Sequence, residues 1–347
     1  MRAAVMRGGE LMVDDVPEPT PTTGQVLVRT LACGICGSDL HALRHGDQFV
    51  AMAHETVAAT PDSPLVPEIM DLAHDVVMGH EFCAEVVALG PNVDNCNEGD
   101  IVVSMPAVLD VNGIHPLGYS NRYPGGYGEL MVLSDPLALK VPNALDARRA
   151  ALTEPMAVGL HAVNKSRIRP NMSAVVLGCG PIGLAVIAAL RLHGIGHVVA
   201  ADLSPTRRSL ATTMGATTAV DPREEPAVDA WRRDPARGPL VIFEAVGVPG
   251  MIDEAMRSAP RDTHIVVVGV CMVPDTIRPM RGITRELSMQ FVLGYDPLEF
   301  ADTLRHIAEG ELDAGSLITS SVDLAGVPGA FEALTDPDAN AKILVEP

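Results

Sequence analysis

Two cysteines three positions apart, Cys33 and Cys36, are the first residues in the chain whose spacing could do chemistry; they lie in the stretch ACGICGSDLH. Such a pair can be a redox dithiol, half of a structural zinc site, or one metal ligand beside a packed thiol. A closed zinc site needs a second pair of cysteines or two histidines at matching spacing. The remaining cysteines are Cys83, Cys96, Cys179 and Cys271. None of these forms a second pair, so a four-cysteine site is excluded.

Three other residues are candidate metal ligands. His80 and Glu81 belong to a GHE triplet that follows a hydrophobic stretch, and Glu154 begins the stretch EPMAVGLHA. Zinc binds Cys thiolate, His nitrogen and carboxylate oxygen, and a catalytic site keeps one position open for water or substrate. Cys36, His80 and one carboxylate would form a formally neutral zinc site. The residues themselves leave open whether Glu81 or Glu154 binds directly.

A glycine-rich loop directly follows the β-branched run AVVL and opens a helical stretch. Its candidate cofactor-binding residues are Gly178, Gly180, Pro181, Ile182 and Gly183. In the G-x-G-x-x-G pattern, the first glycine makes the turn, the second lets the backbone approach a pyrophosphate, and the third allows close helix packing. The loop therefore predicts a dinucleotide site at the start of this helix.

Asp202 ends the next β-branched run, at the distance where a carboxylate accepts hydrogen bonds from the adenosine ribose. A helix-capping role is the alternative, although Ser204 and Pro205 already provide a good cap and first turn. A carboxylate here repels a 2′-phosphate, so NAD is favoured over NADP. Arg207 and Arg208 weaken that preference, because a nearby arginine can accommodate the phosphate.

The elements that must position these residues belong to two regions. From Val26 to about Leu139, short apolar runs broken by turn-forming residues predict a β-rich domain. After Glu154, helical stretches alternate with β-branched runs, which predicts an α/β fold with a doubly wound parallel sheet. The expected strands are residues 174–178, 197–202, 217–221, 240–245, 264–270 and 289–294.

The last 50 or so residues lose this alternation and are expected to return to the first domain. The predicted catalytic domain is therefore formed by residues 1–154 and 295–347, and the predicted dinucleotide-binding domain by residues 155–294.

Composition limits the partners. The chain has 347 residues, 47% of them hydrophobic, and a formal net charge of −19. That charge repels nucleic acid and anionic lipid, so a small-molecule ligand is favoured. No apolar run has the length of a membrane span, and the N-terminus has no signal-peptide core. Scattered cysteines argue against a disulfide framework, so a cytoplasmic protein is expected.

The motifs CGICGSDLH, GHE, EPMAVGLHA and GCGPIGL occur in the order typical of zinc-dependent medium-chain alcohol and polyol dehydrogenases, which the sequence resembles across essentially its whole length. The resemblance implies a GroES-like catalytic domain, a Rossmann domain and one catalytic zinc per chain. It implies Cys36, His80 and an acidic group as ligands. Glu154 stands where sorbitol-dehydrogenase-like members have glutamate, and Glu81 where a carboxylate binds the metal or lies just behind it.

The resemblance also implies an activity and further roles. The expected reaction interconverts a secondary alcohol or polyol and its carbonyl by hydride transfer with NAD. Separately, the stretch SMQFVLG is expected to be an exposed edge strand that pairs with another subunit in a homodimer or homotetramer. Asp39 is expected to hold the far nitrogen of His80. Ser38 and His41 are expected to carry the alcohol proton to solvent. The backbone groups of Val268 and Val270 are expected to meet the nicotinamide carboxamide.

Two departures from the family pattern stand out. Between Gly90 and Leu133 the chain has only Cys96 where many members bind a structural zinc, so that zinc is expected to be absent. The interval 42–78 is much longer than usual, and an insertion beside an active site shapes the substrate mouth. Its histidines, His45, His54 and His74, are not expected to bind metal.

Two alternative functions are compatible with the same fold. A zinc-independent quinone or enoyl reductase of the same superfamily would not need Cys36, His80 and Glu154. A non-catalytic NAD-binding sensor would not need Ser38 and His41.

Overall fold

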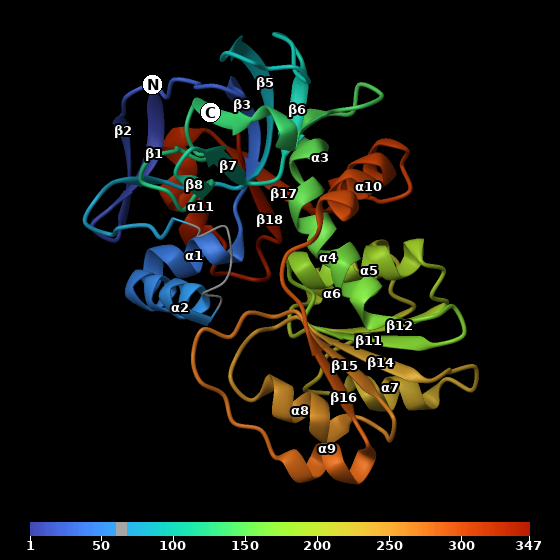
Figure 1. Cartoon of the computed structure of the whole chain (residues 1–347). Coiled ribbons are helices and arrows are strands. Elements are labelled where there is room, and N and C mark those ends of the chain that lie inside the picture. Colours follow the sequence, from blue (N-terminus) through green and yellow to red (C-terminus); the bar gives the residue numbers. More distant parts are fainter. Residues whose placement is uncertain (60–67) are drawn as a thin grey trace. The chain divides into compact units, whose positions relative to one another are not determined.

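The computed structural model describes residues 1–59 and 68–347, which divide into two compact units (Figure 1). The first unit is Met1–Glu154, Ile318–Thr335 and Lys342–Pro347, and the second is Pro155–Leu317 and Asp336–Ala341. Part of the expected insertion, residues 60–67, lies outside the described residues. In the described part, no helix is long and apolar enough to cross a bilayer.

The first unit is built mainly from short strands, as its apolar runs predict. Its strands are β1 (Arg2–Arg7), β2 (Glu10–Asp15), β3 (Gln25–Gly34), β4 (Val76–Val77), β5 (Glu81–Leu89), β6 (Ile101–Ser104), β7 (Ala107–Asp110), β8 (Gly113–Pro116), β9 (Leu130–Ser134), β10 (Ala138–Lys140), β17 (Ile318–Val322) and β18 (Lys342–Val345). Its helices are α1 (Gly37–Arg44), α2 (Gly46–Ala59), α3 (Ala147–Ala151) and α11 (Val327–Ala333). The interval 42–78 thus contributes helix α2, which its sequence did not suggest.

Strand β3 is the centre of the main sheet in this unit. The order is β10-β6-β5-β3-β18-β17, and β9 also pairs with β3. Apolar side chains of these strands, among them Val26, Val28 and Phe82, are buried in one core with Tyr127 and Leu133. This core fixes the strand registers, because a slip by one residue would turn each strand's buried side chains outward.

The second unit confirms the predicted doubly wound parallel sheet. Its strands are β11 (Ser173–Leu177), β12 (His197–Ala201), β13 (Thr218–Val220), β14 (Leu240–Glu244), β15 (His264–Val267) and β16 (Ser288–Phe291). Its helices are α4 (from Thr153, in the first unit, to Ser166), α5 (Pro181–Leu192), α6 (Pro205–Thr213), α7 (Ala227–Arg233), α8 (Met251–Ser258), α9 (Pro279–Arg285) and α10 (Pro297–Ala308).

Every pairing in this sheet is parallel, in the order β13-β12-β11-β14-β15-β16. The direction of winding changes between β11 and β14. Parallel sheets of this kind bind ligands outside the carboxyl ends of the strands at such a switch point. The glycine loop that follows β11 lies at this point.

The return to the first unit begins later than residue 295. Helix α10 and the residues up to Leu317 belong to the second unit. Glu299 on α10 explains part of this difference, because its carboxylate accepts hydrogen bonds from His161 Nδ1 at 2.6 Å and Asn164 Nδ2 at 2.8 Å, both on α4. The chain returns to the first unit at β17.

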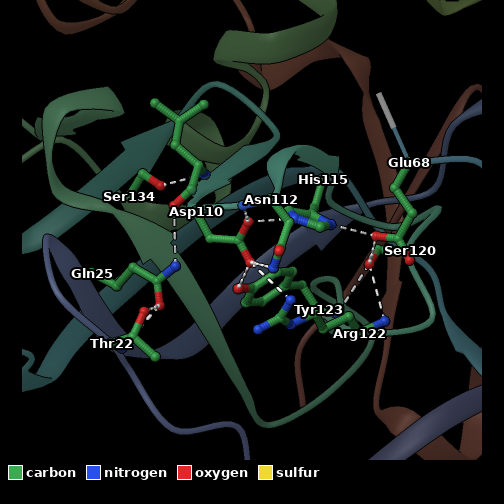
Figure 2. A network of polar contacts seen from close by, with 11 residues as sticks. Thr22, Gln25, Glu68, Asp110, Asn112, His115, Ser120, Arg122, Tyr123 and Ser134 are labelled. Carbon is green, nitrogen blue, oxygen red and sulfur yellow. Dashed lines mark hydrogen bonds and ion pairs between the residues drawn. The ribbon is translucent and has the colours of Figure 1, made fainter. Parts of the chain in front are cut away.

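Residues 105–124, here called the hairpin lobe, occupy the segment where many family members bind a structural zinc. The lobe contains the β7–β8 hairpin and a cluster of charged side chains around His115 (Figure 2). His115 Nδ1 lies 2.6 Å from Glu68 Oε2, and its Nε2 lies 2.9 Å from Asp110 Oδ1. Arg122 and Tyr123 also bind Asp110, each at 3.0 Å. Polar contacts therefore hold the lobe together.

Acid is expected to weaken the hairpin lobe through Asp110. Burial opposes ionisation, but hydrogen bonds from His115, the Asn112 amide and Tyr123 outweigh it and hold the pKa of Asp110 well below its ordinary value. A lowered folded-state pKa stabilises the fold fully above the unfolded pKa of about 4, and this contribution is lost as the pH falls further. Asp110→Asn should lower the free energy of unfolding by about 1–3 kcal/mol at pH 7.

The check is urea unfolding of wild type and Asp110→Asn from pH 7 down to the lowest pH at which both fold. The difference between the two proteins should shrink below about pH 4. Asp14→Asn is the control, since Asp14 pairs with Arg7 on the surface and its removal should leave unfolding nearly unchanged. A difference that stays constant with pH would contradict the role given to Asp110.

Candidate metal centre and cofactor loop

Strand pairing brings the first motif next to the second. Gly34, the last residue of β3, pairs with Glu81, the first residue of β5. Cys36 follows β3 and caps the N-terminus of α1, while His80 immediately precedes β5. A Cβ atom on Gly34 would lie 2.0 Å from Glu81 Oε2, so only glycine leaves space for that carboxylate.

These segments form a compact set of metal-binding atoms. The ligand atoms of Cys36, His80 and Glu81 all lie within 4.8 Å of one another. Thiolate, imidazole and carboxylate are donors that zinc accepts, so the residues fit a zinc ion. His80 and Glu81 are buried and Cys36 is half-buried, as a site open to one small ligand requires.

Cys33 is not paired with Cys36. Both thiols are free, and Cys33 is buried. A Cβ atom added to Gly126 would lie 2.6 Å from the Cys33 Sγ atom, and one added to Gly79 would lie 2.9 Å from it. Gly79 also has φ of 102°, which favours glycine. Burial, with the negative charges of Asp39 and Glu81, raises the pKa of Cys33 well above its ordinary value. Cys33 is therefore a packed, protonated thiol.

Asp39 lies behind His80. The Nδ1 atom of His80 is buried without an ideally oriented partner, and Asp39 Oδ1 is 3.4 Å away. The other Asp39 oxygen accepts hydrogen bonds from the Cys36 amide at 3.0 Å and the Tyr127 hydroxyl at 2.6 Å. The Cys36 amide and the Tyr127 hydroxyl thus hold the Asp39 carboxylate in place, with its other oxygen facing the Nδ1 atom of His80.

Glu81 forms a buried ion pair that sequence reasoning missed. Both of its oxygens accept hydrogen bonds from Lys342 Nζ, at 2.8 and 2.7 Å, and Lys342 also donates to the Ile35 carbonyl at 2.9 Å. Burial disfavours the ammonium, but the Glu81 charge outweighs it and raises the pKa of Lys342. The only sequence signal was a lysine inside the apolar ending AKILV.

The other predicted residues lie at different positions. Glu154 begins α4 and is not a member of the compact ligand set found among the described residues, although its charge acts on Lys342. Ser38 lies in the first turn of α1, two residues after Cys36. His41 lies one turn further, half-buried; burial, then the charges of His45 and Arg44, lower its pKa. A neutral His41 can accept a proton.

The glycine loop has the shape that its pattern predicts. Gly178 has φ of 90°, which favours glycine, and a Cβ on Gly183 would lie 2.0 Å from the Gly178 carbonyl oxygen. A Cβ on Gly180 would meet nothing nearer than Arg207 Nη1, at 4.0 Å. Helix α5 begins at Pro181, so its free N–H groups face the open side of the loop.

Asp202 and the two arginines have separate partners. Asp202 accepts hydrogen bonds from the Cys179 amide at 2.7 Å and the Ser204 amide at 2.8 Å, which holds its carboxylate beside the glycine loop. Each carboxylate oxygen keeps a second lone pair. Arg208 binds Asp221 at 3.2 Å and two backbone carbonyls. Arg207, by contrast, has a buried Nε without a hydrogen-bond partner.

Val268 and Val270 follow β15 at the carboxyl edge of the sheet. The Val268 amide donates to the Glu244 carbonyl at 2.8 Å, so it is already engaged within the sheet edge. A Cβ atom added to Gly247 would lie 2.7 Å from the Val270 amide nitrogen, so the two backbone segments are in close contact. The Val270 side chain is exposed.

Comparison with known proteins assigns both units to one family. Residues 22–143 match the alcohol dehydrogenase GroES-like domain, and residues 181–309 match the zinc-binding dehydrogenase family. The chain is 32% identical to (R,R)-butanediol dehydrogenase of Bacillus subtilis over 97% of each chain. It is 27% identical to sorbitol dehydrogenase of the same organism, over 100% of this chain and 97% of that one.

Solved structures agree. The crystal structure of 2R,3R-butanediol dehydrogenase from Bacillus subtilis has a TM-score of 0.84 and 30% identity, covering 100% of this chain and 99% of the other. A zinc-binding dehydrogenase from Sinorhizobium meliloti, solved with NADP, has a TM-score of 0.84 and 26% identity over 100% and 99% of the chains. The chain belongs to the zinc-binding alcohol dehydrogenases, oxidoreductases that act on CH–OH groups with zinc and NAD(P).

Proposed function

We propose that this dehydrogenase interconverts a small vicinal diol or polyol and the corresponding hydroxyketone, with NAD as the hydride acceptor. The observation that carries the proposal is that Cys36 and His80 meet at a buried carboxylate, Glu81, with the three ligand atoms within 4.8 Å of one another. The names of two relatives, a butanediol dehydrogenase and a sorbitol dehydrogenase, support the substrate class, because both alcohols carry hydroxyl groups on adjacent carbons.

Cys36 and His80 are proposed to hold the zinc together with one carboxylate. Zinc, when bound, supplies a Lewis acid that polarises the substrate oxygen. Because Lys342 occupies both oxygens of Glu81, we assign Glu154 as the direct carboxylate ligand and Glu81 as the negative charge behind the metal. Asp39 orients His80 by facing its Nδ1 atom.

Ser38 and His41 are proposed to move the substrate proton. Ser38 accepts it from the substrate hydroxyl and releases its own proton to a hydroxyl of the cofactor ribose, which in turn gives a proton to His41. The lowered pKa of His41 keeps its imidazole neutral near pH 7, so that it can accept this proton and release it to solvent. These residues therefore remove the proton while the substrate carbon transfers hydride to the nicotinamide.

The second unit is proposed to bind NAD in preference to NADP. The carboxylate of Asp202 is fixed beside the loop by two amide groups and would repel a 2′-phosphate. Arg207 lies over Gly180, near the expected pyrophosphate, and Arg208 is already bound to Asp221. The backbone of Val268 and Val270 is proposed to border the nicotinamide.

We further propose a cytoplasmic homodimer or homotetramer. Strand β16 is an edge of the parallel sheet, and Phe291 at its end is 63% exposed, followed by Leu293 at 84%. Such an edge can pair with a second copy. Light scattering should give a mass of at least twice 36.6 kDa, and a monomer at micromolar concentration would exclude the assembly. Six free cysteines fit a reducing compartment, which cell fractionation tests.

The test is a panel of vicinal diols, polyols, simple secondary alcohols and primary alcohols, each assayed with NAD and with NADP by the absorbance of reduced cofactor. Vicinal diols or polyols with NAD should give the highest kcat/KM. Full activity after chelation would instead indicate a zinc-independent reductase. Cofactor binding without turnover of any substrate would indicate a sensor.

A further inference from the structure

Tyr119, a residue of the hairpin lobe, places its hydroxyl group between two residues of the proposed active site. The hydroxyl oxygen lies 2.8 Å from Ser38 Oγ and 2.9 Å from Asp39 Oδ1. An ionised carboxylate can only accept, so the Tyr119 hydroxyl donates its single proton to Asp39, and before the cofactor binds the Tyr119 oxygen accepts from Ser38. The three groups form a chain from Ser38 through Tyr119 to Asp39.

The Tyr119 ring is held from two sides. It packs against the His80 ring, with centroids 5.4 Å apart, and against Phe49 of α2, with centroids 4.9 Å apart. Burial and then the charge of Asp39 raise the pKa of Tyr119 well above its ordinary value, so the hydroxyl keeps its proton. The position of Tyr119 therefore depends on α2, which belongs to the long interval 42–78.

The neighbouring residue anchors the backbone. Ser120 donates from Oγ to Glu68 at 2.6 Å, and the same Glu68 oxygen lies 2.6 Å from His115 (Figure 2). The Tyr119 amide donates to the Pro116 carbonyl at 3.1 Å. The hairpin lobe thus places the Tyr119 hydroxyl in the site. Ring contacts hold the Tyr119 side chain, and hydrogen bonds of Tyr119 and Ser120 hold the backbone.

We propose that Tyr119 is a positioning residue for Ser38: its hydroxyl holds the Ser38 side chain in the one rotamer from which Ser38 can reach the substrate hydroxyl. This inference rests on the proposed role of Ser38. Asp39 does not depend on Tyr119 for its place, because its other oxygen is bound by the Cys36 amide and the Tyr127 hydroxyl. The effect of Tyr119 on turnover therefore passes through Ser38, not through the metal ligands.

Tyr119→Phe keeps the ring and removes only the hydroxyl. It should lower kcat roughly tenfold, the loss of one hydrogen bond that orients a reacting group, with little change in KM. Ser38→Ala should lower kcat about 100-fold. The double variant should be no slower than Ser38→Ala alone, because Tyr119 has nothing left to position. Multiplied effects, about 1000-fold in the double variant, would overturn the proposal.

Two readouts do not depend on turnover. Crystal structures should show one Ser38 rotamer in wild type and more than one in Tyr119→Phe; an unchanged single rotamer would overturn the proposal even if no substrate of the panel is turned over. Zinc content and the absorption of the cobalt-substituted protein should match wild type in Tyr119→Phe. A loss of zinc or a shifted cobalt spectrum would mean that Tyr119 acts on the metal ligands, which also overturns it.

Tyr123→Phe is the matched control. Tyr123 lies in the same lobe, and its hydroxyl donates to Asp110 at 3.0 Å. Removing it should lower the thermal midpoint of unfolding slightly and leave kcat and the Ser38 rotamer as in wild type. A tenfold loss of kcat in Tyr123→Phe would show that any loosening of the lobe slows turnover. That result would contradict a specific role of Tyr119.

Discussion

Replacing Cys36 by serine is expected to remove the bound zinc and to lower kcat/KM by about 1000-fold or more. Polarisation of the substrate oxygen by a metal ion contributes several kcal/mol to the transition state, and each 1.4 kcal/mol corresponds to a factor of about ten. The Sγ atom of Cys36 is the only thiolate donor in the ligand set found among the described residues. A serine hydroxyl at this position is a poor ligand for zinc.

The matched control is the same chemical change three residues earlier. Cys33 is buried against Gly79 and Gly126 and is not a member of the compact ligand set found among the described residues. Cys33→Ser should therefore keep close to one zinc per chain, measured by atomic emission on dialysed protein, and should keep most of the activity. If Cys33→Ser lost zinc as completely as Cys36→Ser, the two cysteines would form a pair after all.

Glu81→Gln and Glu154→Gln address the carboxylate ligand in the same assay. Under the proposed assignment, Glu154→Gln should lose zinc and Glu81→Gln should keep it. The opposite result would make Glu81 the ligand and require its release from Lys342.

The candidate metal-binding residues were found in the sequence because their signals are local. Cys36 and His80 each lie in a short motif, and Asp39, whose carboxylate is 3.4 Å from His80, belongs to the same motif as Cys36. The second unit was predictable for a related reason: most of its strands are short runs rich in β-branched residues, and each strand is followed by a helix. Such patterns need no knowledge of distant pairing.

The missed contributors come from distant segments. Lys342 reaches Glu81 only because β18 pairs with β3, with Leu344 opposite Gly34. Tyr119 reaches Ser38 only through the fold of the hairpin lobe, whose sequence differs from the family pattern. A single sequence contains no signal for either pairing, because register depends on the assembled core. The contacts of α10 with α4, which keep α10 in the second unit so that the return to the first unit comes at Ile318, likewise join distant segments.

The second large effect is expected for Lys342→Met, which should lower the free energy of unfolding of the zinc-loaded protein by about 3–5 kcal/mol. Lys342 and Glu81 are 1% and 0% exposed, and the Lys342 ammonium is the cation that contacts both Glu81 oxygens. Without it, the buried Glu81 carboxylate loses the one side-chain donor known to contact both of its oxygens. Calorimetry should detect this in the first unit, whereas the single tryptophan, Trp231, reports on the second.

A double variant distinguishes the loss of the buried ion pair from a loss of side-chain packing. Glu81→Gln combined with Lys342→Met removes both charges, and it should recover much of the lost stability, since replacing a whole buried ion pair by neutral groups is often nearly neutral. Lys140→Met is the control, because Lys140 pairs with Asp100 at the surface at 2.8 Å and should unfold like wild type. If Lys342→Met were no less stable than Lys140→Met, the buried pair of Lys342 and Glu81 would contribute no more to the fold than a surface ion pair, and the structural role given to it here would be wrong.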